Sequence, residues 1–206
     1  NCDRGWGYTL DSVEKVLNQT IKGDRASKLI TFLTFLSTYT RQSQINLAFV
    51  APSSAGKTYN ALETARLFPK EDIVSLAYAS PKSFFHDVNK EKDPETGAEI
   101  VDLRRKILIF LDQPHYELSA TLRPLLSHDQ PVITVKIADK NLKSGLRART
   151  ISLLGFPSFV YCSAKMDLDE QEQTRFFLLS PDTDENKSRE AIREVIKRST
   201  DTTGYF

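Results

Sequence analysis

The chain has 206 residues, and its 28 lysines and arginines against 27 acidic residues give a formal net charge of +1. This length predicts one domain, and a hydrophobic content of 40% excludes a wholly disordered chain. Because the bulk charge is almost neutral, it gives no argument for nucleic-acid binding, and any basic surface must be local. The two cysteines are too few for a disulfide framework or a cysteine-rich zinc site, and the apolar run FVYC predicts a buried thiol for Cys162.

The sequence has no membrane-spanning or export signal. It contains no run of about 18 consecutive apolar residues and no signal-peptide pattern. We therefore expect a soluble, cytoplasmic protein with no membrane partner. The first residue is Asn1 rather than Met, which suggests that the chain is a piece of a longer protein.

Hydrophobic periodicity divides the single predicted domain into an N-terminal helical segment, 1–44, and a core, 45–206. Apolar residues at helical spacing predict helices in the first segment at 10–21 and 25–39. Short apolar runs predict buried strands in the core at 45–50, 73–77, 106–111, 158–163 and 176–179. Helical patterns separate or follow these strands at 58–67, 83–88, 117–126 and 185–198.

Two further regions of the core do not fit this alternation. Residues 89–102 are polar and contain Pro94 and Gly97, which predicts a loop or an irregular hairpin. Residues 132–137 and 147–153 alternate as the arms of a β-hairpin, with Gly145 near its tip. Strands that alternate with helices indicate a three-layer α/β fold with a largely parallel sheet, an N-terminal helical pair and an inserted β-hairpin.

The first predicted strand runs into the sequence APSSAGKT, residues 51–58, and then into a helix. This is the phosphate-loop pattern G-x-x-x-x-G-K-[ST] with alanine at the first glycine. We expect Lys57 to reach the β- and γ-phosphates and Thr58 to ligate Mg²⁺, while backbone N–H groups bind phosphate oxygens. The alternative is a chance GKT in an exposed turn, but a strand and a helix flank the motif as the chemistry needs. The predicted nucleotide-binding residues are Ala51, Pro52, Ser53, Ser54, Ala55, Gly56, Lys57, Thr58 and Tyr59.

The strongest predicted strand, KILIFLD, ends in Asp112. In the Walker B arrangement such a carboxylate lies beside the Mg²⁺ held by the phosphate-loop hydroxyl, so Asp112 is the second predicted metal ligand. The alternative is an aspartate that merely ends a strand. Gln113, a predicted catalytic residue, follows where many ATP-hydrolysing motors have a glutamate, and an amide orients water without acting as a base. His115 and Glu117 are either its substitutes or ordinary residues of a helix start.

The predicted hairpin concentrates positive charge in a chain that is otherwise balanced. Residues 136–149 carry five cations and one acid. A basic stripe of this kind contacts nucleic-acid phosphates without reading base sequence. The alternative is a solvated hairpin whose charges protect an exposed edge. The predicted DNA-binding residues are Lys136, Lys140, Lys143, Arg147 and Arg149.

Two more residues complete the predicted site. Ser163 ends the strand FVYCS, where we expect it to sense the γ-phosphate. Arg175 follows an acidic stretch, 167–172, and opens the strand RFFLL. We expect it to stabilise transferred charge in a neighbouring subunit, as an arginine finger does. The alternative for Arg175 is an ordinary ion pair with Glu170 or Glu172.

The order of these parts resembles the AAA+-like ATPase modules of DNA helicases that plasmids, phages and other mobile elements carry, often attached to primases. The resemblance covers about 45–198 and rests on APSSAGKT, ILIFLD, the helix ELSATLRPLLSHD, the basic hairpin, PSFVYCSA and DEQEQTRFFLLSPD. Of these, only the phosphate loop is specific on its own. The resemblance implies a P-loop NTPase fold, ATP and Mg²⁺ as ligands, and a homo-oligomer such as a hexameric ring. It also implies a role in DNA replication in which the hairpin tracks DNA.

Carried over to single residues, the resemblance implies the same site as the motifs: Lys57 and Thr58 at the nucleotide, Asp112 at Mg²⁺, Ser163 as sensor, Arg175 as finger, and Lys140, Lys143 and Arg147 at the DNA. The sequence departs from the family pattern at Ala51 and Gln113, and it shows no separate lid domain after the core.

We therefore expect an ATP-hydrolysing DNA helicase or translocase module. One alternative is a nucleotide-dependent switch or clamp that binds DNA and hydrolyses ATP poorly, which Gln113 favours. Another is a small-molecule kinase, which needs a lid with arginines over the phosphates. Residues 89–102 contain only Lys90 and Lys92 as cations, so the kinase is the weaker alternative.

Overall fold

The computed structural model describes most of the chain: residues 9–77, 84, 91–92, 97, 99–139, 147–165, 173–181, 189–190, 192–193 and 196. For 137–139 and 147–149 the description covers the backbone alone. Most of the predicted helical segments at 83–88 and 185–198 lie outside the described residues, as does the tip of the predicted hairpin.

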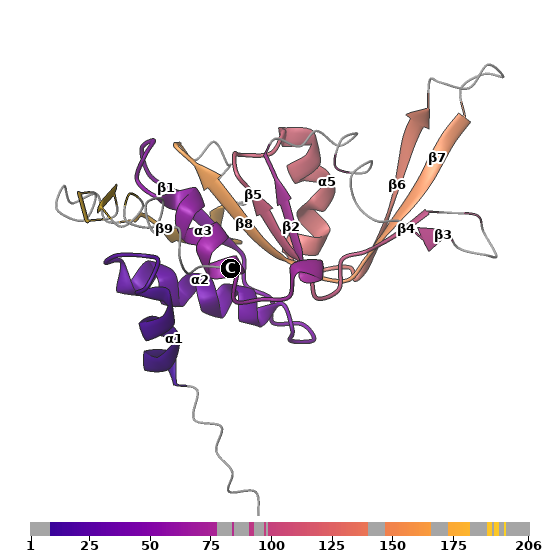
Figure 1. Ribbon diagram of the computed structural model, residues 1–206. Coiled ribbons are helices and arrows are strands. Elements are labelled where there is room, and N and C mark those ends of the chain that lie inside the picture. Colours follow the sequence, from indigo (N-terminus) through magenta and orange to yellow (C-terminus); the bar gives the residue numbers. More distant parts are fainter. Residues whose placement is uncertain are drawn as a thin grey trace, which may run out of the picture.

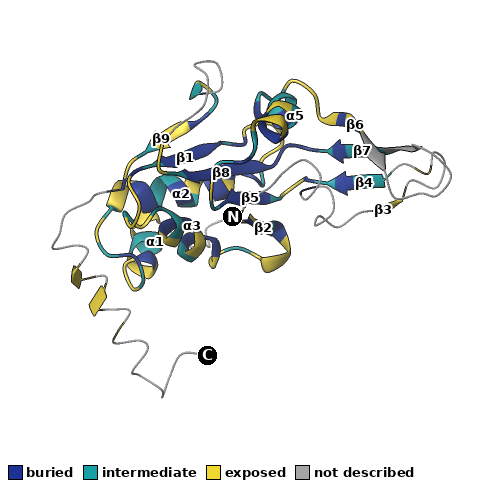
Figure 2. Ribbon diagram, turned by 90° about the horizontal axis from the view of Figure 1, so that it is seen from above, coloured by how far each residue is buried: buried dark blue, intermediate teal, exposed yellow. Residues whose placement is uncertain are grey.

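A five-stranded sheet forms the centre of the molecule (Figure 1). Each neighbouring pair of strands in this sheet is parallel. In spatial order the strands are β2 (Ile73–Leu76), β5 (Ile107–Phe110), β8 (Ser158–Ser163), β1 (Leu47–Val50) and β9 (Phe177–Leu179). All five fall within the predicted apolar runs, and Figure 2 shows that β5, β8 and β1 are largely buried, whereas β9 is largely exposed.

Helices cover both faces of the central sheet, because successive strand residues point to opposite faces and both sets are apolar. One cluster joins the sheet to α2 (Arg25–Ser37) and α3 (Lys57–Ala65) through Phe35, Leu47, Phe49, Ala61, Ala65, Ile107, Ile109, Val160 and Cys162. The opposite face packs on α5 (Tyr116–Leu126), with Phe110 and Phe159 in the same cluster as Leu118 and Leu122. The result is a three-layer α/β architecture, as predicted.

The helix α1 (Leu10–Leu17) packs on α2, and α2 is joined to the sheet by polar as well as apolar contacts. The Thr38 hydroxyl donates to the carbonyl oxygen of Lys106 over 2.9 Å, and the Ser158 hydroxyl donates to that of Thr34 over 3.1 Å. The first contact reaches the residue just before β5, and the second involves the first residue of β8. A short 3₁₀ turn, η1 (Lys70–Asp72), directly precedes β2, and so lies at the amino end of that strand.

The predicted hairpin is present but does not stand alone. Its arms, β6 (Val132–Asp139) and β7 (Arg147–Leu154), belong to a second, four-stranded sheet with β3 (Glu91–Lys92) and β4 (Glu99–Asp102). The strands β3 and β4 are antiparallel, whereas β4 pairs with β7 in parallel. The prediction of one sheet with an inserted hairpin was therefore incomplete, and the irregular-hairpin interpretation of 89–102 is the one that the structure favours.

The second sheet extends the central one at the amino ends of β5 and β8. The backbone N–H of Leu103, which follows β4, donates to the carbonyl oxygen of Leu154 over 2.8 Å. The backbone N–H of Ser158 donates to the carbonyl oxygen of Lys106 over 3.1 Å. Each of two long stretches of chain thus contributes a strand to both sheets. Both ribbon views show the second sheet projecting from the molecule on the side away from β9 and α1 (Figures 1 and 2). Within the described parts of the chain, no helix is both long and apolar enough to cross a bilayer.

Tyr39, just after α2, ties the N-terminal helices to the start of β2. Its hydroxyl donates to Asp72 Oδ2 over 2.7 Å, and the Arg105 guanidinium lies 5.1 Å from the ring centroid. Burial, followed by the hydrogen bond to Asp72, raises the pKa of Tyr39 to about 12. Because the pKa in the folded state lies above the unfolded value of about 10, the phenol's contribution to stability is complete below about pH 10. It is lost as the pH rises through about 12.

We expect Tyr39→Phe to lower the free energy of unfolding by about 1 kcal/mol near neutral pH, the usual net value of one hydrogen bond. The Phe ring keeps the packing and the contact with Arg105. Urea unfolding of both proteins from pH 8 to pH 12 measures the difference between them, and lysines that titrate in this range cancel. The difference should shrink above pH 10, and a difference that stays constant to pH 12 contradicts the assignment.

Candidate functional site

The carboxyl ends of three parallel strands meet at one cavity. The strand β8 lies between β1 and β5, so the segments that follow these strands are brought to one edge of the sheet. The cavity has a volume of about 510 Å³ and is lined by Ser53, Ser54, Gly56, Lys57, Thr58, Tyr59, Leu111, Asp112, Cys162 and Ala164. Open α/β sheets bind ligands at the carboxyl ends of their strands, at the point where the connections from neighbouring strands run to opposite sides of the sheet. Here the chain passes from β1 to the β2 edge and later returns to β9 on the other side.

The loop after β1 has two residues with a left-handed backbone, one of which is the glycine of the GKT sequence. Gly56 lies at φ 79° immediately before α3, in the left-handed region where glycine is unstrained. Ser54 adopts φ 68°, so a second residue of the loop is left-handed. Ala51 is not among the described non-glycine residues that have a positive φ. Alanine at the first motif position therefore causes no left-handed strain.

Lys57 lies across the loop that precedes it. Its Nζ donates to the carbonyl oxygens of Ala51 and Pro52 over 2.6 and 2.8 Å. Lys57 is also the first residue of α3, where the backbone N–H groups of the first turn have no partner inside the helix. The ammonium group and the positive end of the helix dipole therefore act on the same part of the cavity, and both favour an anion there.

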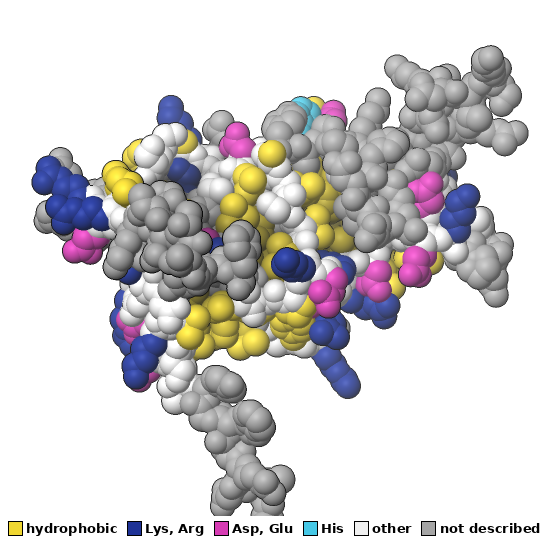
Figure 3. All heavy atoms as spheres, viewed as in Figure 1, with side chains coloured by type: hydrophobic (Ala, Val, Ile, Leu, Met, Phe, Trp, Pro, Cys, Tyr) yellow, Lys and Arg dark blue, Asp and Glu magenta, His cyan; other side chains and the backbone are white. Residues whose placement is uncertain are grey.

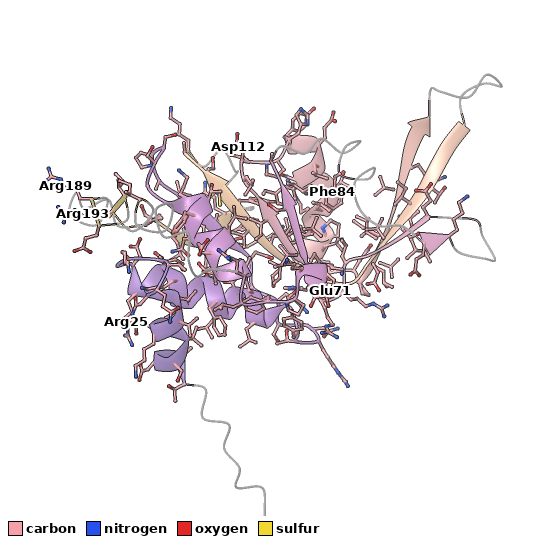
Figure 4. The ribbon with its side chains drawn as sticks, viewed as in Figure 1. Arg25, Glu71, Phe84, Asp112, Arg189 and Arg193 are labelled. Carbon is pink, nitrogen blue, oxygen red and sulfur yellow. The ribbon has the colours of Figure 1, made fainter. Side chains whose placement is uncertain are left out.

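Thr58 and Asp112 approach the cavity from different elements, the helix α3 and the end of β5. In Figure 4 Asp112 lies at the upper edge of the sheet, whereas Glu71, just before β2, lies at the lower edge. The backbone N–H of Gln113 donates to Asp112 Oδ1 over 2.8 Å, which orients the carboxylate. A hydroxyl and a carboxylate suit Mg²⁺, which is typically bound by one or two protein oxygens together with substrate phosphates. These two side chains therefore fit the predicted metal site.

Cys162 forms part of the cavity wall beside Thr58. Burial raises the pKa of the Cys162 thiol to about 11, opposed by its hydrogen bond with Thr58 and by the charge of Lys57. The thiol is therefore protonated at neutral pH. It was correctly predicted to be buried but not to belong to the site.

The three residues predicted to orient or activate water lie between the end of β5 and the first turn of α5, outside the residues that line the cavity. They are Gln113, His115 and Glu117. His115 caps α5, because its Nδ1 accepts from the backbone N–H of Glu117 over 3.4 Å. The same nitrogen lies 3.8 Å from Glu117 Oε2. The structural role of a helix start thus accounts for both His115 and Glu117.

Ser163 supports the site through its backbone. Its carbonyl oxygen accepts from the N–H of Ala51 over 3.3 Å, which links the end of β8 to the phosphate loop. Its hydroxyl donates to the carbonyl oxygen of Lys165 in a local turn. Cys162 and Ala164 line the cavity, whereas Ser163 is not among its lining residues.

Arg175 lies near the amino ends of the central strands, whereas the cavity lies at their carboxyl ends. It precedes β9, and Phe177 at the start of β9 pairs with Leu47 at the start of β1. Its Nε donates to the Ser127 hydroxyl after α5, and the side chain lines a separate cavity of about 530 Å³. At about 3.3 Å per strand residue, the length of β1 separates it from the phosphate loop. Arg175 therefore does not join the site of its own chain, and its predicted ion-pair partners lie outside the described residues.

The predicted DNA-binding residues all belong to the second sheet or to its tip. Lys136, in β6, is exposed and pairs with Thr150, on the face opposite to the buried Ile133 and Ile151. Arg147 and Arg149 are paired with Asp139 and Ile137 along the backbone. Their side chains lie outside the described part of the structure, as do Lys140 and Lys143 altogether.

Sequence reasoning missed Leu111, Cys162 and Ala164 as parts of the cavity. A signal existed for two of them, since residues two apart on a strand share a face and β8 ends at the site. The comparisons with known proteins add no identity, because no family model matches the chain and no curated protein matches it.

Proposed function

We propose that the chain is the ATP-binding and ATP-hydrolysing motor module of a DNA helicase or translocase, which acts as an oligomer in the replication of a mobile element. One observation carries the ATPase part of this proposal. The phosphate loop, Asp112 and the end of β8 line the same cavity, although they are far apart in the sequence. A chance GKT motif in an exposed turn would not bring a carboxylate from another strand to its side.

Phosphoryl transfer requires mainly positioning and charge stabilisation. In this proposal the N–H groups at the start of α3 hold the phosphates, and the Lys57 ammonium stabilises charge on their oxygens. Thr58 and Asp112 hold Mg²⁺, which would neutralise the charge that develops during transfer. Gln113 directly follows Asp112 but is not among the residues that line the cavity, and its amide would orient the attacking water without taking its proton.

The DNA-binding part of the proposal rests on charge and on shape. The second sheet projects from the core, and its hairpin carries five cations in a chain of net charge +1. On the face of the molecule shown in Figure 3, the described lysine and arginine side chains are scattered rather than gathered in one patch. A projecting arm reaches a nucleic-acid backbone without obstructing the nucleotide cavity. The arm begins at the amino ends of β5 and β8, so movement at the nucleotide can reach it through two continuous stretches of chain.

Replacement of Lys140, Lys143 and Arg147 by alanine should weaken binding of single-stranded DNA and reduce its salt dependence. Each lost phosphate contact lowers the slope of log K against log salt concentration by about 0.7, so three contacts account for about 2. The matched control removes Lys15, Arg41 and Lys70, three exposed cations outside the second sheet, and causes the same change in net charge. Equal slopes for the hairpin variant and the wild type would exclude the hairpin from the DNA site.

A nucleotide-dependent DNA clamp is the second candidate, and Gln113 favours it because an amide is no general base. Single-turnover hydrolysis of bound ATP, with and without single-stranded DNA, separates the two. A motor hydrolyses the bound ATP faster when DNA is present. A clamp hydrolyses the bound ATP at the same slow rate with and without DNA.

A further inference from the structure

We propose that Tyr59 is the stacking surface for the base of the bound nucleoside triphosphate and that the turn between α1 and α2 holds its ring in place. This inference rests on the proposed function, since it concerns the same cavity. It assigns a base-binding residue to a site whose other proposed ligand-binding residues hold phosphates and metal.

Tyr59 and Thr58 lie in the first turn of α3 and line the same cavity, but they point in different directions. Successive residues of a helix are rotated by about 100°, so Tyr59 points in another direction from Thr58. Thr58 contacts Cys162 at the end of β8. The Tyr59 hydroxyl instead donates to the backbone carbonyl of Thr20 over 3.0 Å, in the turn between α1 and α2. Tyr59 nevertheless lines the cavity, and 36% of its surface is exposed.

The turn that holds Tyr59 is itself fixed by a buried lysine. Lys28 in α2 is only 1% exposed, and its Nζ donates to Asn18 Oδ1 and to the carbonyl oxygen of Ile21 over 3.1 Å. These bonds hold both sides of Thr20. The tyrosine ring is therefore placed against a rigid element rather than a free loop, which reduces the entropy lost when a base stacks on it.

A partly exposed aromatic side chain that lines the same cavity as the phosphate loop suits a nucleobase. Aromatic stacking is worth about a 5- to 150-fold gain in affinity per base, and it tolerates different bases because each has a π-face. In the proposed site the phosphates are held at the start of α3, and Tyr59 directly follows Thr58, the proposed metal ligand. A nucleoside triphosphate whose phosphates occupy the loop can therefore reach the ring with its base.

The test compares Mg²⁺-ATP with inorganic tripolyphosphate, which keeps the phosphates and lacks the base. Calorimetric titration of the full chain gives the ratio of the two affinities. Tyr59→Leu removes the ring, whereas Tyr59→Phe keeps it and removes only the bond to Thr20. Leu62→Ala, at an exposed position of the same helix outside the cavity, is the matched control.

For Tyr59→Leu we expect a 5- to 150-fold loss of ATP affinity and an unchanged affinity for tripolyphosphate, within about twofold. Tyr59→Phe and Leu62→Ala should keep the wild-type ratio within about threefold. A wild-type ratio in Tyr59→Leu, or an equal loss of both ligands, overturns the base-stacking inference and leaves the phosphate site intact. If the wild type binds neither ligand, the proposed function fails, and this inference fails with it.

Discussion

Lys57→Ala should weaken binding of Mg²⁺-ATP by about 10- to 150-fold and abolish turnover. A hydrogen bond that involves a charged group contributes about 1.5–3 kcal/mol, and 1.4 kcal/mol corresponds to tenfold in affinity. The Lys57 ammonium already lies across the phosphate loop, bonded to the carbonyl oxygens of Ala51 and Pro52. Its loss removes the charge from the phosphate end of the cavity. Calorimetric titration with ATP measures the change in affinity, and thermal unfolding checks that the fold is retained.

Lys15→Ala is the matched control, because Lys15 is an exposed lysine of α1 outside the cavity. It should bind ATP as the wild type does. Unchanged ATP affinity in a folded Lys57→Ala variant would remove the phosphate loop from any nucleotide site.

Gly155→Ala should lower the free energy of unfolding by about 2–4 kcal/mol. Gly155 joins β7 to β8, and therefore the second sheet to the central one, at φ 93°. An added Cβ would lie 3.0 Å from the backbone nitrogen of Arg104 and 3.1 Å from its Cα, and it would overlap Arg104 Cγ. The left-handed backbone costs an alanine about 1–2 kcal/mol, and displacement of a neighbouring backbone adds to that. Chemical denaturation of both proteins measures the difference.

Gly97→Ala separates the cost of the left-handed backbone from the cost of the close approach of Arg104. Gly97 also has a positive φ, 66°, but an added Cβ there meets nothing within 4 Å. We expect this control to lose only the backbone term, about 1–2 kcal/mol. Equal losses at Gly155 and Gly97 would mean that the close approach of Arg104 contributes nothing to stability.

The central sheet could be predicted because its strands are short runs of apolar residues separated by helical patterns. In the second sheet the hairpin of β6 and β7 could be predicted, but the pairing of β7 with β4 could not. In β4 only Ile100 and Val101 are apolar, between Glu99 and Asp102, so the segment has the composition of a loop. Its main partner is β7, about fifty residues further along the chain, and no local pattern indicates a pairing of that range.

The candidate site also has a part that the sequence alone predicts and a part that depends on the fold. The phosphate loop is one contiguous motif with its own backbone chemistry, so residues 51–58 could be located by their sequence alone. Asp112 depended on strand order, since a carboxylate at the end of a strand reaches the loop only if the strands are near neighbours. Cys162 was identified as buried, but its place beside Thr58 depends on which face of β8 it occupies. The contact of Tyr59 with Thr20 depends on how the N-terminal helices pack.

The rate of ATP hydrolysis as a function of single-stranded DNA concentration, with oligomer mass recorded alongside, tests the central claim most directly. A motor module predicts a rate that rises with DNA and saturates, and a Lys57→Ala variant whose rate stays at background throughout. A wild-type rate no higher than that of Lys57→Ala at every DNA concentration would contradict the account.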